Sequence, residues 1–131
     1  MASILRVNTL TDASSNNSVP MATVASGSAK AWFHVAADGA SISDSFNISS
    51  HDDDGTGDGG IHITNDMGSA NYSVLLSSDD AGSSSKIMTL ELTQGTQAAG
   101  NFDYEGALVN SSTNRTNQDV MRFGAILGDL A

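Results

Sequence analysis

The fold is decided by the stretch Ala31-Trp32-Phe33-His34-Val35-Ala36. Aromatic and β-branched residues such as these favour strands, and a turn signal, Asp38-Gly39, follows them. Further on, Ser45-Phe46-Asn47-Ile48-Ser49 alternates polar and apolar side chains, as a strand with one buried face does. The two stretches predict the first antiparallel pair of a β-sheet. Trp32, the only tryptophan, is expected to pack in the core with its indole N–H bonded.

The same short-period alternation continues to the end of the chain. Ile61 and Ile63 share one face of a predicted strand while His62 takes the other, and an acidic, glycine-rich loop is expected before them. Further strands are predicted at residues 61–64, 72–76, 88–92 and 119–127, with connections at 65–71 and 79–85 and no clear pattern over 95–117. Frequent strands without helical crossovers predict an all-β fold, an antiparallel and jelly-roll-like β-sandwich.

The first part of the chain has a different character. Residues 4–10 form a candidate strand, and residues 11–28 are mostly small, with the only proline at Pro20. We therefore expect residues 1–28 to be an extended attachment and assembly arm, and residues 29–131 to be the sandwich domain. The apolar residues of the arm that would contact partner molecules are Ile4, Leu5, Val7 and Leu10.

Charge and composition exclude several classes of function. The chain has fifteen acidic and five basic residues, for a net charge of −10. Nucleic-acid binding depends on clustered Lys and Arg, so DNA and RNA are not expected as partners. No apolar run is long enough for membrane insertion, and no secretory leader pattern opens the sequence, so export by the secretory route is not expected. The chain has no cysteine and hence no disulfide or thiolate chemistry.

The interior of a single copy is expected to be thin. Apolar residues make up 39% of the chain, and many of them are alanines, which contribute little transfer free energy on burial. A chain of this kind gains stability by burying further apolar surface against copies of itself, and an arm can add strands to a neighbour or wrap around it. The composition therefore predicts a homo-oligomer.

A series of short motifs carries a family resemblance. In chain order they are Lys30-Ala31-Trp32, the stretch DSFNISS at 44–50, Gly55-Thr56-Gly57-Asp58, and ANYSV at 70–74. In this order they resemble a module of tailed-phage tail-fibre and virion structural proteins. Residues 120–128 look like the last strand of that module, and ILRVNTL at 4–10 is similar to the amino-terminal segment of many such fibres.

The resemblance implies a non-enzymatic structural protein on the exterior of a bacteriophage virion. It implies a homo-oligomer, with a trimer favoured, that contacts other virion structural proteins. Two placements remain open at this stage: a tail-fibre-like component that touches the host, and a capsid decoration or cement protein. The host cytoplasm would be the place of synthesis.

One acidic stretch has the residue types of a cation site. Asp52, Asp54, Thr56 and Asp58 stand at alternate positions, as the oxygen ligands at the start of a calcium loop do. The position that would supply the final acidic ligand is Ile63, which has no oxygen on its side chain. Calcium is thus the one candidate metal, a solvated acidic turn is the alternative, and no other cofactor is expected.

A second hypothesis is that the chain is a carbohydrate-binding module for a host receptor. The candidate site is the polar stretch Phe102, Asp103, Tyr104 and Glu105, because sugar sites combine aromatic rings with carboxylates. No enzymatic activity is expected, since the three histidines lack the spacing of metal ligands and no serine stands in a nucleophile turn. Arg122, on the predicted last strand, is expected to pair with a carboxylate of an adjacent strand or subunit.

Overall fold

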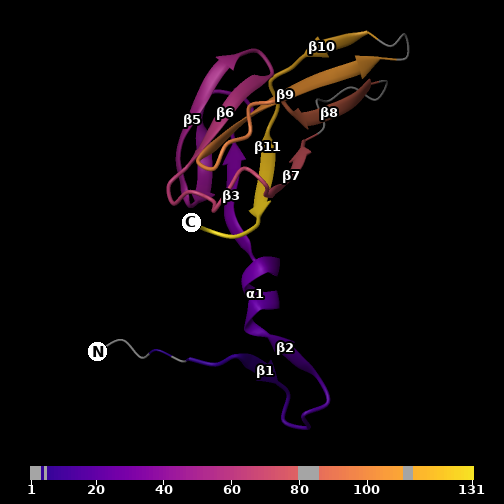
Figure 1. Cartoon of the computed structure of the whole chain (residues 1–131). Helices are drawn as coiled ribbons and strands as arrows, with labels where there is room; N and C mark the ends of the chain where they lie inside the picture. The colour runs from indigo at the N-terminus through magenta and orange to yellow at the C-terminus, as the bar shows by residue number, and fades with distance from the viewer. Residues whose placement is uncertain (1–3, 5, 80–85, 111–113) are drawn as a thin grey trace.

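The computed structural model describes residues 4, 6–79, 86–110 and 114–131, and it confirms the all-β sandwich (Figure 1). All strand pairs are antiparallel. The first sheet has the order β4-β3-β11-β7 and consists of β3 (Ala29–Val35), β4 (Ile42–Phe46), β7 (Ser73–Ser78) and β11 (Arg122–Leu127). The second consists of β5 (Ile48–Gly55), β6 (Asp58–Ile63), β8 (Lys86–Leu92), β9 (Asn101–Asn110) and β10 (Arg115–Asn117).

The core lies between the two sheets. Phe33 of β3 stands near its centre, with ring centroids 6.1 Å from Phe102 and 6.3 Å from Tyr104 on β9. Ile61 and Ile63 point inward as predicted, and His62 points outward. The other buried members are Ala31, Val35, Met67, Tyr72 and Ile126.

At Asn47 the chain passes from the first sheet to the second. The residues around it were expected to form one strand, but they divide into β4 of the first sheet and β5 of the second. Asn47 has a φ of 58°, a left-handed conformation that asparagine tolerates better than most residues. Its side chain donates to the carbonyl oxygens of Lys30 and Asn65, and its Oδ1 accepts from the Asn65 amide at 2.9 Å. These bonds fix the corner.

The acidic stretch is a hairpin of two strands rather than the predicted loop. β5 is the edge strand of its sheet, where outward carboxylates stay in water and discourage pairing with another edge. The turn into β6 needs Gly57, whose φ is 83°. A Cβ at Gly57 would also lie 2.4 Å from the carbonyl oxygen of Gly106 on β9, so the close approach of the turn to β9 depends on a residue without a side chain.

Residues 95–117, for which the sequence showed no clear pattern, contain the central strand of the second sheet. β9 pairs with β6 through residues 101–105 and with β8 through residues 104–110. β10 pairs with β9 further along, from Ala107 to Val109. The strand predicted over 119–127 is shorter than expected, since β11 begins at Arg122.

The arm projects from the start of β3, away from the sandwich (Figure 1). It holds a small hairpin of β1 (Thr9–Thr11) and β2 (Ser18–Pro20), followed by the helix α1 (Met21–Gly27). The helix was not predicted, and the strand expected over residues 4–10 overlaps β1 only at Thr9 and Leu10. Lys30 joins the arm to the body: its Nζ donates to the Ala25 carbonyl oxygen of α1 and, at 2.9 Å, to the Ser28 carbonyl oxygen. In the described part of the chain, no helix is long and apolar enough to span a bilayer.

Candidate functional site

The outer side of the first sheet carries large apolar side chains in contact with solvent. We call this surface the outer face and define it by Trp32, Phe46, Leu75 and Phe123, which are 39%, 54%, 61% and 36% exposed. The core position expected for Trp32 is therefore wrong. Ala31, Phe33 and Val35 take the inward positions of β3, so Trp32 and His34 point the other way.

Strand register aligns the outer face into two rows across all four strands. The first row runs Phe46, Trp32, Ala125, Leu75. The second runs Asp44, His34, Phe123, Ser77, and within it His34 packs on Phe123 with ring centroids 4.5 Å apart. The first row has no charged side chain, in a protein whose net charge is −10. Exposed apolar patches of this kind mark interaction surfaces in soluble proteins.

The arm also leaves apolar side chains in water. Of the predicted assembly residues, Ile4 is 76% exposed, Val7 37% and Leu10 46%, while Leu5 lies outside the described residues. Val19 of β2 and Val24 of α1 are exposed to a similar degree. The arm thus has apolar side chains that its own body does not cover.

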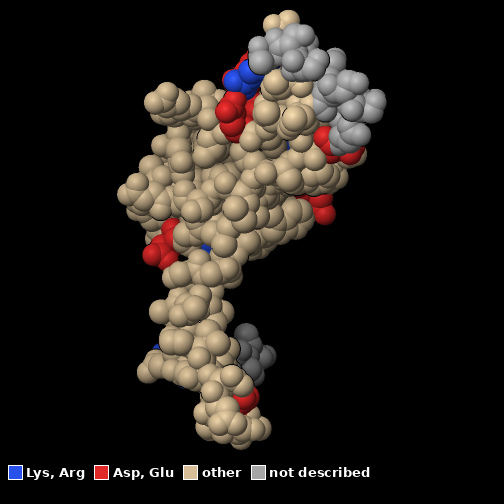
Figure 2. Space-filling model, turned by 90° about the vertical axis from the view of Figure 1, so that its right-hand side faces the viewer, with Lys and Arg blue, Asp and Glu red and all other residues tan. Residues whose placement is uncertain are grey.

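Charged side chains are distributed unevenly over the surface. Figure 2 shows acidic groups at separate points around the rim of the visible side and near the tip of the arm, while most of that side is uncharged. Arg115 lies between two of the acidic groups, with its Nη2 2.5 Å from Glu91 Oε1 and 3.1 Å from Glu105 Oε2. Because Glu91 and Glu105 face each other across β8 and β9, Arg115 offsets their mutual repulsion.

The four candidate calcium ligands are not brought together. Asp52 Oδ2 lies 2.7 Å from His62 Nε2, and the Asp58 carboxylate accepts from Asn117 Nδ2 at 3.3 Å. Asp54 and Thr56 are exposed at the turn. Among the residues that the structure describes, no group of three or more acidic or histidine side chains is placed to hold a metal ion. In this arrangement Asp52 forms a polar contact within the hairpin, and Asp58 forms one with β10.

The candidate sugar site on β9 is divided between two surfaces. Phe102 and Tyr104 are 0% and 1% exposed because they point into the sandwich, whereas Asp103 and Glu105 point outward. A sugar cannot stack on a ring in that position. The stretch is an alternating strand, and Tyr104 is a core residue.

A buried polar network closes one end of the core. Arg122, which is 0% exposed, donates from Nη2 to Asp119 Oδ1 at 3.1 Å and from Nη1 to the Tyr104 hydroxyl at 3.3 Å. Its guanidinium carbon lies 5.2 Å from the centre of the Tyr104 ring. The Asp119 carboxylate also accepts from the Gly57 amide at 2.8 Å. Arg122 therefore pairs with a carboxylate of its own chain, three residues away. Nothing in the sequence pattern indicates that its side chain is buried.

His51 completes this network from the edge strand. Its Nε2 lies 2.7 Å from the Tyr104 hydroxyl. Because Arg122 already donates to that hydroxyl, the Tyr104 proton is free to point at a neutral His51 nitrogen. Burial lowers the pKa of His51 below its ordinary value, and the Arg122 charge acts in the same direction, whereas Asp52 and Asp53 oppose it. Burial likewise raises the pKa of Tyr104.

We predict that the protein loses stability as the pH falls below about 6.5. The unfolded chain takes up a proton on His51 near the ordinary pKa of 6.5, while the folded chain does so only at its lower pKa. The free energy of unfolding should therefore decrease between about pH 7.5 and about pH 5.5, as measured by urea titration. The variant His51→Gln should show a smaller decrease, and an equal decrease would contradict the assignment to His51.

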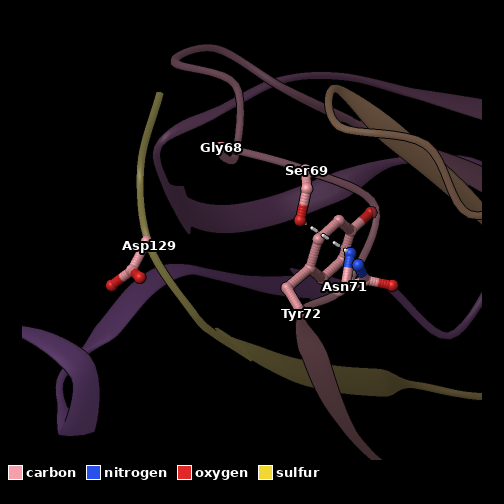
Figure 3. A pocket seen from close by; sticks show the side chains of 5 residues that line it. All are labelled: Gly68, Ser69, Asn71, Tyr72 and Asp129. Atoms are coloured by element: carbon pink, nitrogen blue, oxygen red, sulfur yellow. Dashed lines mark hydrogen bonds between the residues drawn. The ribbon is translucent and has the colours of Figure 1, made fainter.

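A polar hollow lies beside the start of β7. It has a volume of about 230 Å³ and is lined by Gly68, Ser69, Asn71, Tyr72 and Asp129 (Figure 3). The Tyr72 ring forms part of the wall, and its hydroxyl donates to the backbone at Ala98 and Asn101. Burial raises the pKa of Tyr72 to about 12. The Asn71 backbone N–H donates to Ser69 Oγ at 3.1 Å (Figure 3). Among the described residues, no hydrogen-bond partner is found for the Asn71 side-chain amide or for the Asp129 carboxylate.

Comparison with protein families, with curated proteins and with solved structures found no match.

Proposed function

We propose that the protein is a non-enzymatic structural component of a tailed-phage virion, an oligomeric β-sandwich on the exterior of the particle. The observation that carries the proposal is the apolar surface left uncovered in two places, on the outer face and along the arm. A subunit whose work is assembly needs such surfaces, because burial of apolar area drives association. The motif resemblance supports the virion as the place of assembly and supports a trimer as the oligomer.

The two placements on the virion differ in copy number. A decoration protein covers the head in hundreds of copies, whereas a tail-fibre-like component is present in a handful. The high negative charge suits either exterior position, because it keeps the surface soluble and separate from the packaged nucleic acid.

The test is to quantify this chain against the major capsid protein in purified virions. We expect its band in the particle fraction, at a ratio that distinguishes decoration from fibre. If the chain is absent from particles but present in the lysate of infected cells, the proposal is wrong.

A second candidate function, glycan binding, is favoured by the polar hollow. Sugar hydroxyls are recognised by carboxylate and amide side chains, and Asp129 and Asn71 present both groups beside the Tyr72 ring (Figure 3). The volume of about 230 Å³ would accept a single sugar unit. This site replaces the one predicted on β9.

A glycan array with the intact protein tests this candidate. Binding that is lost in Asp129→Ala and kept in Asp103→Ala would support it, because Asp103 is an acidic residue outside the hollow. An array without binding, or binding that Asp129→Ala leaves unchanged, would contradict it.

A further inference from the structure

We propose that the outer face is the contact between copies of this chain, in which the β4–β3 half of one copy packs against the β11–β7 half of the next. The proposal rests on the homo-oligomer of the proposed function and names its interface. The copies lie side by side in the same orientation, around a rotation axis that is parallel to β3. Three features of the structure support a second copy as the occupant of this face.

The first feature is the fit between the first row of one copy, which is Phe46, Trp32, Ala125 and Leu75, and the same row of its neighbour. A rotation axis along the strands keeps each row at the same level in every copy, so the β4 end of a row meets the β7 end of the neighbour's row. Phe46 then lies beside Leu75 of the next copy, and the bulky Trp32 lies opposite the small Ala125. Large side chains facing small ones interdigitate, as packed sheets require.

The second feature is charge. Two copies of a chain with a net charge of −10 repel each other unless they meet where carboxylates are scarce. The row of Phe46, Trp32, Ala125 and Leu75 has none. In the neighbouring row, the same rotation places Asp44 of one copy against Ser77 of the next, so a carboxylate meets a hydroxyl and not another carboxylate.

The third feature is the size of the face and the direction of the arm. Four strands about 4.8 Å apart make a face roughly 19 Å wide, so three faces would enclose an axis about 5 Å from each sheet, which is half the spacing of packed sheets. The face alone is smaller than the about 800 Å² for each partner that a stable interface needs, so the arms have to bury the remaining area. The arm leaves the body at the start of β3 (Figure 1), so the same arrangement places the exposed Val24 of α1 beside neighbouring arms.

The test compares association of charge-bearing variants by sedimentation equilibrium of the intact chain. Phe46→Lys and Leu75→Glu should each weaken association at least about 100-fold, because each places an unpaired charge in the contact. The double variant should recover at least about tenfold of that loss, because the two new charges meet across copies. Within one chain the two positions lie on opposite edge strands of the sheet, so this recovery cannot arise inside a copy.

Ile87→Lys is the matched control. Ile87 is 71% exposed on β8 of the second sheet, so the substitution adds the same charge at an exposed apolar site away from the outer face. It should leave association unchanged. If the wild-type chain associates but Phe46→Lys and Leu75→Glu do not weaken it, the interface is wrong while the homo-oligomer stands. A wild-type chain that stays monomeric overturns both the interface and the oligomer of the proposed function.

Discussion

Replacing Arg122 by alanine should lower the free energy of unfolding by about 2–4 kcal/mol, a large part of the stability of a domain of this size. The guanidinium is fully buried, and it bonds Asp119, which lies between β10 and β11, and Tyr104 of the second sheet. Removing the guanidinium leaves a cavity between the sheets. It also leaves the Asp119 carboxylate without its positively charged partner, although the Gly57 amide still donates to it. Urea titration at a fixed protein concentration measures the loss.

Two comparisons identify the cause of that loss. Arg122→Met restores much of the volume without the charge, so it should cost less than alanine, and adding Asp119→Asn to Arg122→Met should recover part of the remainder. Arg115→Ala removes an arginine whose side chain is 39% exposed and should cost no more than about 1 kcal/mol. A loss for Arg122→Ala as small as that for Arg115→Ala would contradict the role given to the buried network.

Gly124→Ala should destabilise the protein by about 1–3 kcal/mol through a clash in the core. Gly124 faces Phe33 across the β3–β11 ladder, and a Cβ there would lie 2.2 Å from the Phe33 ring. The ring lies over the glycine and reaches the aromatic rings of β9 from that position. Since the core around it is close-packed, the ring has little room to move.

Thermal and urea unfolding of a double variant provide the check. Phe33→Leu removes the ring that clashes, so the cost of Gly124→Ala should be smaller in that background than in the wild type. Gly27→Ala is the control, because a Cβ at Gly27 meets nothing within 4 Å. Equal costs for Gly124→Ala in both backgrounds would show that the Phe33 ring is not the obstacle.

The alternation of polar and apolar residues predicts the fold class, but it does not show which face of each strand is buried. A period of two separates Ala31, Phe33 and Val35 from Trp32 and His34 without saying which set is buried. The sequence predicts a core position for Trp32, but its side chain is 39% exposed. In the structure its partner across the ladder is Phe46, also exposed, so the two belong to one surface whose apolar character is continuous over four strands. That continuity is visible only once register is known.

Other features needed long-range pairing. The acidic, glycine-rich composition of the hairpin predicts a loop, yet an edge strand tolerates carboxylates. Arg122 looks like any strand arginine until Tyr104 and Asp119 are brought to it from 18 and 3 residues away. The helix α1 has only seven residues and no side-chain cap, so the usual signals of a helix start are absent. The predicted β9 site failed for the same reason as Trp32: alternation did not reveal which face was buried.

The central claim is that apolar surface on the outer face and the arm is covered by copies of the same chain. The most direct measurement is the mass of the intact wild-type protein by sedimentation equilibrium at about 10 µM and about 100 µM. We predict an oligomer, with a trimer at three times the 13.4 kDa mass of one chain. A stable monomer of 13.4 kDa at both concentrations would contradict the claim.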